Sequence, residues 1–79
     1  MPTPVKLPNL GVDASEARIV AWRRHAGDHV TAGEPLVEIE TEKANVDVEA
    51  PVSGRLSEII AAEGAEVPVG TVIAMIEDV

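Results

Sequence analysis

The sequence of 79 residues contains no cysteine, no phenylalanine and no tyrosine, and it has a single tryptophan. Without cysteine there is no disulfide, no thiolate nucleophile and no cysteine ligand for zinc or an iron–sulfur cluster. The scarcity of aromatic side chains removes the platforms on which single-stranded nucleic acid stacks. The core must be thin and built from Ala, Val, Ile and Leu, because a chain of this length buries only about 60% of its unfolded surface.

Positive charge is also scarce, since six Lys and Arg residues against fourteen Asp and Glu residues give a formal net charge of −8. Nucleic acids and anionic membrane surfaces are bound by dense basic faces, so we expect neither as a partner. No apolar run approaches the ~20 residues that span a bilayer, and the first residues lack the basic and apolar regions of a signal peptide. Together with the lack of cysteine, these absences predict a cytoplasmic location.

Glycine and proline, six of each, are spread evenly, so residues 1–79 are expected to form a single domain without a linker. Between them lie short runs rich in Val, Ile and Thr, which are typical of strands. The only candidate helix, residues 57–63, is about two turns long and lacks a cap. The predicted strands are Val5–Leu10, Arg18–Arg24, Pro35–Thr41, Asn45–Ala50, Arg55–Ala61 and Thr71–Ile76, with two shorter ones around residues 29–30 and 66–67.

An internal repeat emerges when the chain is shifted against itself by 37 residues. The matched pairs include Gly27/Gly64, Val30/Val67, Gly33/Gly70, Arg18/Arg55 and Lys6/Lys43. Two copies of one unit of three or four strands can bury their apolar faces only against each other, which predicts an all-β sandwich or flattened barrel with an approximate twofold. The same symmetry predicts that the two termini and the segment around Lys43 lie at opposite ends of the molecule.

Residues 35–50 carry the clearest alternation of apolar and polar side chains in the chain. Pairing apolar residues across a hairpin places Ile39 opposite Val46 and leaves Glu42 and Lys43 as a two-residue tip. The primed turns usual in such hairpins require φ > 0 and favour glycine or asparagine, so Glu-Lys predicts a type I turn instead. A hairpin selected only for stability would not choose this pair, and we infer that the side chain of Lys43 is the reason for it.

Acidic side chains surround this lysine, with six acids and one base between residues 34 and 49. The register places Glu38 opposite Asp47, and like charges in that arrangement repel. One interpretation is a charged edge that prevents aggregation. The other is a surface that attracts the basic rim of a partner's active site and raises the encounter rate.

The segment Glu40-Thr41-Glu42-Lys43-Ala44 resembles the lipoyl-lysine hairpin of lipoyl domains from 2-oxo acid dehydrogenase complexes, within the biotinyl/lipoyl attachment family. The resemblance covers nearly the whole chain. It includes Leu7–Gly11, Ile19–Trp22, Gly27–Val30, Ala50–Gly54, Glu63-Gly64 and Val69-Gly70. It implies a flattened barrel of two four-stranded antiparallel sheets with the modified lysine at one hairpin tip.

The resemblance further implies lipoic acid in amide linkage to Lys43, carrying acyl groups and reducing equivalents as a swinging arm. The implied partners are a thiamine-dependent 2-oxo acid decarboxylase, an acyltransferase core, dihydrolipoamide dehydrogenase and a lipoate-attaching enzyme. The domain would be a monomeric, non-catalytic carrier, either alone or as part of a dihydrolipoamide acyltransferase.

Two other functions remain in competition with this one. A biotin carboxyl carrier domain shares the fold, but its lysine usually lies between two methionines, whereas Lys43 lies between Glu42 and Ala44. An unmodified barrel acting only as an interaction module does not explain a lysine at the apex. Lys6, the only other lysine, falls inside a predicted strand and is expected to stay unmodified.

Other residues with possible chemistry support no further site. His25 and His29 have the spacing of two ligands on a helix, but Gly27 between them indicates a turn, so we predict no metal site. The serines at 15, 53 and 57 lack the glycine pattern of a nucleophile elbow, so we predict no catalytic residue.

Overall fold

A computed structural model describes residues 2–9 and 15–78 of the chain. This part of the chain forms eight β-strands and contains no helix, and hence none long and apolar enough to cross a membrane. The strands are β1 (Pro2–Lys6), β2 (Glu16–Trp22), β3 (His29–Val30), β4 (Pro35–Glu40), β5 (Asn45–Glu49), β6 (Gly54–Ile59), β7 (Glu66–Pro68) and β8 (Val72–Glu77).

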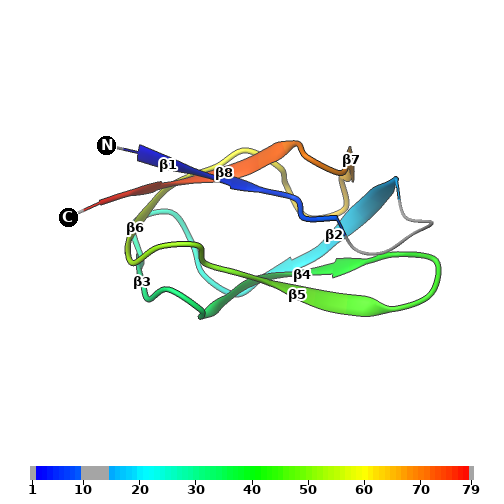
Figure 1. The fold of residues 1–79 in the computed structure, drawn as a ribbon, viewed down its shortest axis with the longest axis horizontal. Helices are drawn as coiled ribbons and strands as arrows, with labels where there is room; N and C mark the ends of the chain where they lie inside the picture. The colour runs from blue at the N-terminus through cyan, green and yellow to red at the C-terminus, as the bar shows by residue number, and fades with distance from the viewer. Residues whose placement is uncertain (1, 10–14, 79) are drawn as a thin grey trace.

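The strands form two four-stranded antiparallel sheets that pack face to face in an elongated molecule of 36 × 20 × 17 Å (Figure 1). One sheet has the order β1-β8-β6-β3 and the other the order β5-β4-β2-β7. The predicted all-β sandwich is therefore confirmed. The largest fully buried side chains, contributed by both sheets, are Leu7, Ile19, Leu36, Ile39, Leu56, Ile73, Ile76, Val5, Val30 and Val37.

The internal repeat relates the two sheets, because a shift of 37 residues carries β2, β3 and β4 onto β6, β7 and β8. Backbone hydrogen bonds repeat with it. The amide of Gly27 donates to the carbonyl of Leu56, and the amide of Gly64 donates to that of Ile19, both at 2.7 Å. Gly27 and Gly64 have φ values of 98° and 90°, which a residue without Cβ adopts without strain. The predicted repeat is confirmed for these strands.

The first strand differs from its prediction. It covers Pro2–Lys6, whereas the sequence pattern predicted Val5–Leu10, and Leu10 lies outside the described residues. The observed strand includes two prolines, Pro2 and Pro4. However, β1 is the edge strand of its sheet, where a proline can sit without breaking the ladder of hydrogen bonds.

Strands β1 and β5 are also repeat mates, but with a different offset. The amide of Gly33 donates to the carbonyl of Ala50 at 2.9 Å, and the amide of Gly70 donates to that of Leu7 at 2.8 Å. Gly70 follows Gly33 by 37 residues, whereas Ala50 follows Leu7 by 43. The chain from Leu7 to Arg18 in β2 is therefore six residues longer than the equivalent chain from Ala50 to Arg55 in β6.

A bulge in β2 explains why two residues three apart both reach the core. Ile19 and Trp22 are buried, and the register of β2 against β4 shifts between Ile19 and Ala21. One extra residue in a strand changes which face the following side chains occupy. The indole of Trp22 donates to the carbonyl of Ala61 at 2.8 Å, which satisfies its N–H inside the core.

Candidate functional site

The hairpin β4–β5 has the register that the alternation of side chains predicted. Ile39 lies opposite Val46, Val37 opposite Val48, and the last cross-strand pair before the tip joins residues 40 and 45. Ile39, Val37 and Val48 are buried against the opposite sheet. The core therefore holds the base of the hairpin in a single register.

The tip is a tight turn with Glu42 and Lys43 at its centre. The amide of Thr41 donates to the carbonyl of Ala44 at 2.8 Å, so these two residues close the turn. No residue other than glycine has positive φ in the described part of the chain, which excludes the primed turns here. The absence of positive φ at Glu42 and Lys43 is consistent with the predicted type I turn.

The hydroxyl of Thr41 lies inside this turn and bonds the backbone around Lys43. Its Oγ1 accepts from the amide of Lys43 at 3.3 Å and from the amide of Ala44 at 3.2 Å. It also donates to the carbonyl of Ala44 at 3.1 Å. This role was not predicted from the sequence, although a threonine at the first position of a turn is a known signal for such a side-chain bond.

Lys43 is exposed, and the turn between β4 and β5 to which it belongs lies at the end of the molecule opposite the chain termini (Figure 1). The predicted separation of the tip from the termini is confirmed. Lys6 has a different environment, since it lies within β1 and pairs with Val72 of β8. With the offset of 43 residues its structural mate is Glu49, so the predicted equivalence of Lys6 and Lys43 is wrong.

Val46 is less buried than the register alone suggests. Its cross-strand neighbour Ile39 is fully buried, whereas Val46 is 40% exposed. β5 is the edge strand of its sheet, so nothing in that sheet covers its outer side toward the tip. An apolar side chain therefore reaches solvent close to the turn that carries Lys43.

Two arginines, one within β2 and one directly after it, compensate part of the negative charge on the outer face of the hairpin. The guanidinium of Arg23 lies 3.0 Å from Asp47 Oδ1 and 3.6 Å from Glu38 Oε1, so it bridges the two carboxylates that face each other. Arg18 forms an ion pair with Glu40. The hydrogen bond to Asp47 and the charge of that carboxylate raise the pKa of Arg23, and Glu38 adds to the effect.

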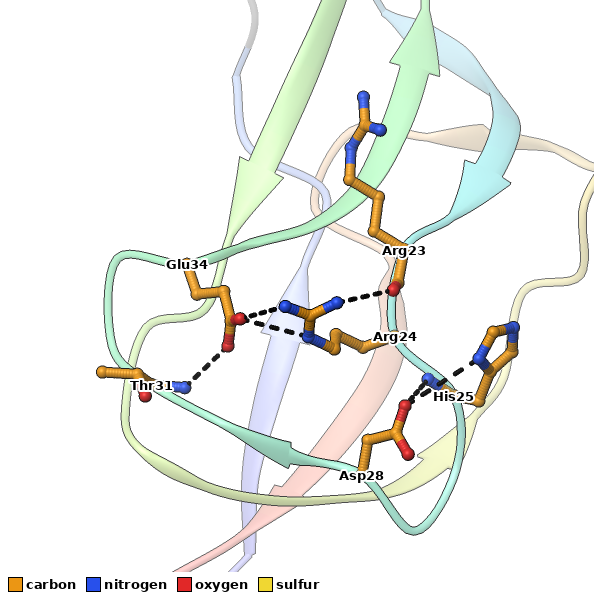
Figure 2. Close-up of polar contacts among 6 residues, drawn as sticks. All are labelled: Arg23, Arg24, His25, Asp28, Thr31 and Glu34. Carbon is orange, nitrogen blue, oxygen red and sulfur yellow. Dashed lines mark hydrogen bonds and ion pairs between the residues drawn. The ribbon is translucent and has the colours of Figure 1, made fainter.

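The end of the molecule opposite the tip holds a second polar cluster, shown in Figure 2. Glu34 forms an ion pair with Arg24 and accepts from the amide of Thr31 at 3.0 Å. The bond from Thr31, followed by that from Arg24, lowers the pKa of Glu34. Asp28 accepts from the amide of His25 at 2.8 Å and lies 3.8 Å from its Nδ1 (Figure 2).

The other residues singled out from the sequence have structural contacts. Ser53 accepts from the amide of Ala32 at 2.9 Å, and Ser57 donates to the carbonyl of Met75 at 3.2 Å. Within residues 2–9 and 15–78, no group of three or more His, Asp or Glu side chains is placed to hold a metal ion. The geometry thus leaves the hairpin tip as the candidate site.

Comparisons with known proteins show which proteins this chain resembles. A family model described as "Biotin-requiring enzyme", of the biotin/lipoyl type, matches residues 3–76. The chain is 43% identical over 77 residues to the dihydrolipoyllysine-residue succinyltransferase component of the 2-oxoglutarate dehydrogenase complex of Bartonella vinsonii subsp. berkhoffii, covering 98% of this chain and 19% of that protein. It is 42% identical over 76 residues to the acetyltransferase component of the pyruvate dehydrogenase complex of Corynebacterium glutamicum, covering 96% and 11%. The chain thus spans about a fifth or less of these two relatives.

Two solved structures are similar to the fold. The urea carboxylase of Kluyveromyces lactis aligns with a TM-score of 0.83 and 26% identity, covering 98% of this chain and 6% of that one. The lipoyl domain of the 2-oxoglutarate dehydrogenase complex of Azotobacter vinelandii aligns with a TM-score of 0.77 and 27% identity, covering 95% of both chains.

Proposed function

The chain belongs to the biotin/lipoyl attachment family, and on that premise we propose that Lys43 is its attachment residue and carries lipoic acid in amide linkage. The observation that carries the proposal is the place of this side chain. Lys43 stands at the centre of an exposed tight turn, at the far end of the sandwich from the termini. The only other lysine, Lys6, lies along a strand paired with β8.

Lipoic acid is favoured over biotin by the relatives and by the residues beside the lysine. The relatives with 42–43% identity are named for a dihydrolipoyllysine residue. The urea carboxylase shares the fold at a lower identity of 26%. The neighbours Glu42 and Ala44 differ from the methionines that usually flank a biotinyl lysine.

The attachment reaction requires a primary amine that an enzyme can approach. The unprotonated Nζ of Lys43 attacks the carbonyl carbon of an activated lipoyl donor, such as an acyl adenylate, and an amide C–N bond forms. The C–O bond to the adenylate breaks, AMP leaves, and the amine loses a proton to solvent. The product has one positive charge fewer, so the net charge changes from −8 to about −9.

Once bound, the lipoyl group supplies a dithiolane for acyl transfer and electron transfer, and the protein supplies its placement. We propose that the domain is a monomeric and non-catalytic carrier. Its partners would be a thiamine-dependent 2-oxo acid decarboxylase, an acyltransferase core, dihydrolipoamide dehydrogenase and a lipoate-attaching enzyme. Support comes from relatives that are components of 2-oxoglutarate and pyruvate dehydrogenase complexes. A cytoplasmic location stays a prediction.

Intact mass spectrometry tests the proposal. The protein incubated with a lipoate-attaching enzyme, ATP and lipoate should gain the mass of one lipoyl group, and Lys43→Ala should gain none. Lys6→Ala is the matched control and should be modified like the wild type. An addition that persists in Lys43→Ala, or a biotinyl mass on protein isolated from cells, would contradict the assignment.

A further inference from the structure

We infer that Thr41 is the positioning residue of the attachment site. Its hydroxyl holds the backbone on both sides of the Lys43 Cα, and this fixes the direction in which the lysine side chain leaves the hairpin. The inference rests on the proposed function of Lys43 as the attachment residue. It assigns Thr41 a part in modification that is separate from any contribution to the stability of the barrel.

The geometry shows one side chain bonded to the two peptide groups that flank the Cα of Lys43. The Thr41 hydroxyl accepts from the amide of Lys43 and from the amide of Ala44, and it donates to the carbonyl of Ala44. A hydroxyl has one proton to donate and two lone pairs, so the three bonds are compatible. The Thr41 hydroxyl therefore ties the Lys43 backbone to the end of β4.

The hydrogen bonds of Thr41 replace the backbone conformations that usually stabilise a two-residue hairpin loop. Such loops rely on residues with φ > 0, and their twist then matches that of the strands. Glu42 and Lys43 supply neither glycine nor asparagine, and neither has positive φ. The half-buried Thr41 has a β-branched side chain with few rotamers, so its hydroxyl stays inside the turn.

Positioning matters for the attachment step because an amine on a long flexible side chain must meet an activated carbonyl. Displacements of about 1 Å at a reacting centre can lower a rate a hundredfold. Lys43 adds several rotatable bonds between its Cα and its Nζ. If the peptide groups around the Cα also move, the amine samples a larger volume, and the fraction of productive encounters falls.

The test compares two variants at position 41 with a matched control at another position. Thr41→Val has the shape of threonine without the hydroxyl, and Thr41→Ser keeps the hydroxyl without the methyl group. The matched control is Thr31→Val, an exposed turn threonine at the other end of the molecule whose backbone amide, not its side chain, bonds Glu34. Each protein is assayed for kcat and KM with a lipoate-attaching enzyme, for amide exchange at residues 43 and 44, and for Tm.

Thr41→Val should lower kcat for lipoyl transfer about tenfold, which corresponds to about 1.4 kcal/mol, with little change in KM or Tm. Amide exchange at residues 43 and 44 should accelerate. Thr41→Ser should restore kcat to near the wild-type value, and Thr31→Val should match the wild type throughout.

Wild-type kcat in Thr41→Val would overturn the inference alone, because the proposed function would still stand. The inference would also be overturned if Thr41→Ser lost as much kcat as Thr41→Val. A marked fall in Tm of Thr41→Val alongside the loss of kcat would overturn it as well. If the wild type accepts no lipoyl group, the proposed function fails and the inference fails with it.

Discussion

Arg18 and Arg23 compensate part of the negative charge of the hairpin. Arg23 bridges Asp47 and Glu38, and Arg18 pairs with Glu40, so three of the acids near the tip have a cationic neighbour. The other two acids of the two strands and the turn, Glu42 and Glu49, are exposed. The expectation that Glu38 and Asp47 only repel each other is corrected, because Arg23 lies between them. The sequence could not place Arg23 there, since it follows β2 and the hairpin begins only after β3.

Glu34 should make the stability of the domain depend on pH in the acid range. Its pKa in the folded protein is lowered from the ordinary value of 4.5 by the amide of Thr31 and the guanidinium of Arg24. Between the two pKa values the unfolded chain binds more protons, so the free energy of unfolding rises with pH there. The stabilisation is full above the unfolded pKa and is lost as pH falls through the folded one. Urea unfolding followed by Trp22 fluorescence from pH 3 to 7 should show a weaker pH dependence for Glu34→Gln.

The matched control for this prediction is Glu58→Gln, which removes a carboxylate from an exposed position on β6. It should keep the pH dependence of the wild type. If the free energy of unfolding changes with pH equally in Glu34→Gln and the wild type, the Arg24–Glu34 cluster contributes nothing to acid unfolding.

At the scale of the element, the hairpin β4–β5 should be the unit that a modifying enzyme recognises. Inserting one alanine between Thr41 and Glu42 keeps the string Glu-Lys-Ala but moves Lys43 off the turn centre and away from the Thr41 hydroxyl. We expect the rate of lipoyl attachment to fall at least about tenfold, because positioning is lost. Mass spectrometry over time measures the rate.

A second variant, Glu42→Lys/Lys43→Glu, tests the same point without changing length or charge. It moves the lysine by one position within the turn and should also be modified slowly. Modification of either variant at the full rate would show that the enzyme reads the local sequence and not the geometry of the hairpin.

The hairpin was largely predictable because one face of each strand is buried. Alternation at Val37 and Ile39 fixes the register, and the absence of glycine at the tip predicts the unprimed turn. The exposure of Val46 and the position of the Thr41 hydroxyl were not predictable in the same way. The first depends on which strand lies at the sheet edge, and the second on a side-chain rotamer inside the turn.

Elsewhere in the fold, too, some features of the glycines could be predicted from the sequence and others could not. The glycines at 27 and 64, which the repeat had matched, both have positive φ. Gly54 has a steric reason instead, since a Cβ there would lie 2.2 Å from the carbonyl oxygen of Glu77. That contact joins β6 to β8, and a strand-to-strand approach of this kind is invisible in the sequence.

For the whole molecule, the distribution of charge predicts how encounter with a partner depends on salt. Glu42 at the tip and Glu49 at the base of the hairpin, opposite Pro35, are exposed, so salt should screen them over a Debye length of about 8 Å at physiological ionic strength. We expect Glu42→Gln/Glu49→Gln to lower kcat/KM for reductive acylation by a partner decarboxylase about threefold at low salt, and less at high salt. These two acids are chosen because replacing Glu38 would also release Arg23.

The matched control changes the same net charge at the opposite end of the molecule, through Glu77→Gln/Asp78→Asn. It should leave kcat/KM close to the wild-type value at every ionic strength. If the three salt curves coincide, the acids of the hairpin serve only solubility and protection of the sheet edge.

The pairing of β1 with β8 has a mechanical consequence. Pro2 lies opposite Glu77, and antiparallel partners are about 5 Å apart, so a longer polypeptide running through this domain would enter and leave it at almost the same point. The folded domain would then add little to the contour length of such a chain and would hang from it as a side group (Figure 1). Tension along the chain would peel β1 from β8 one pair at a time, starting at the end remote from Lys43. A pulling force would therefore reach the turn that presents the lysine last.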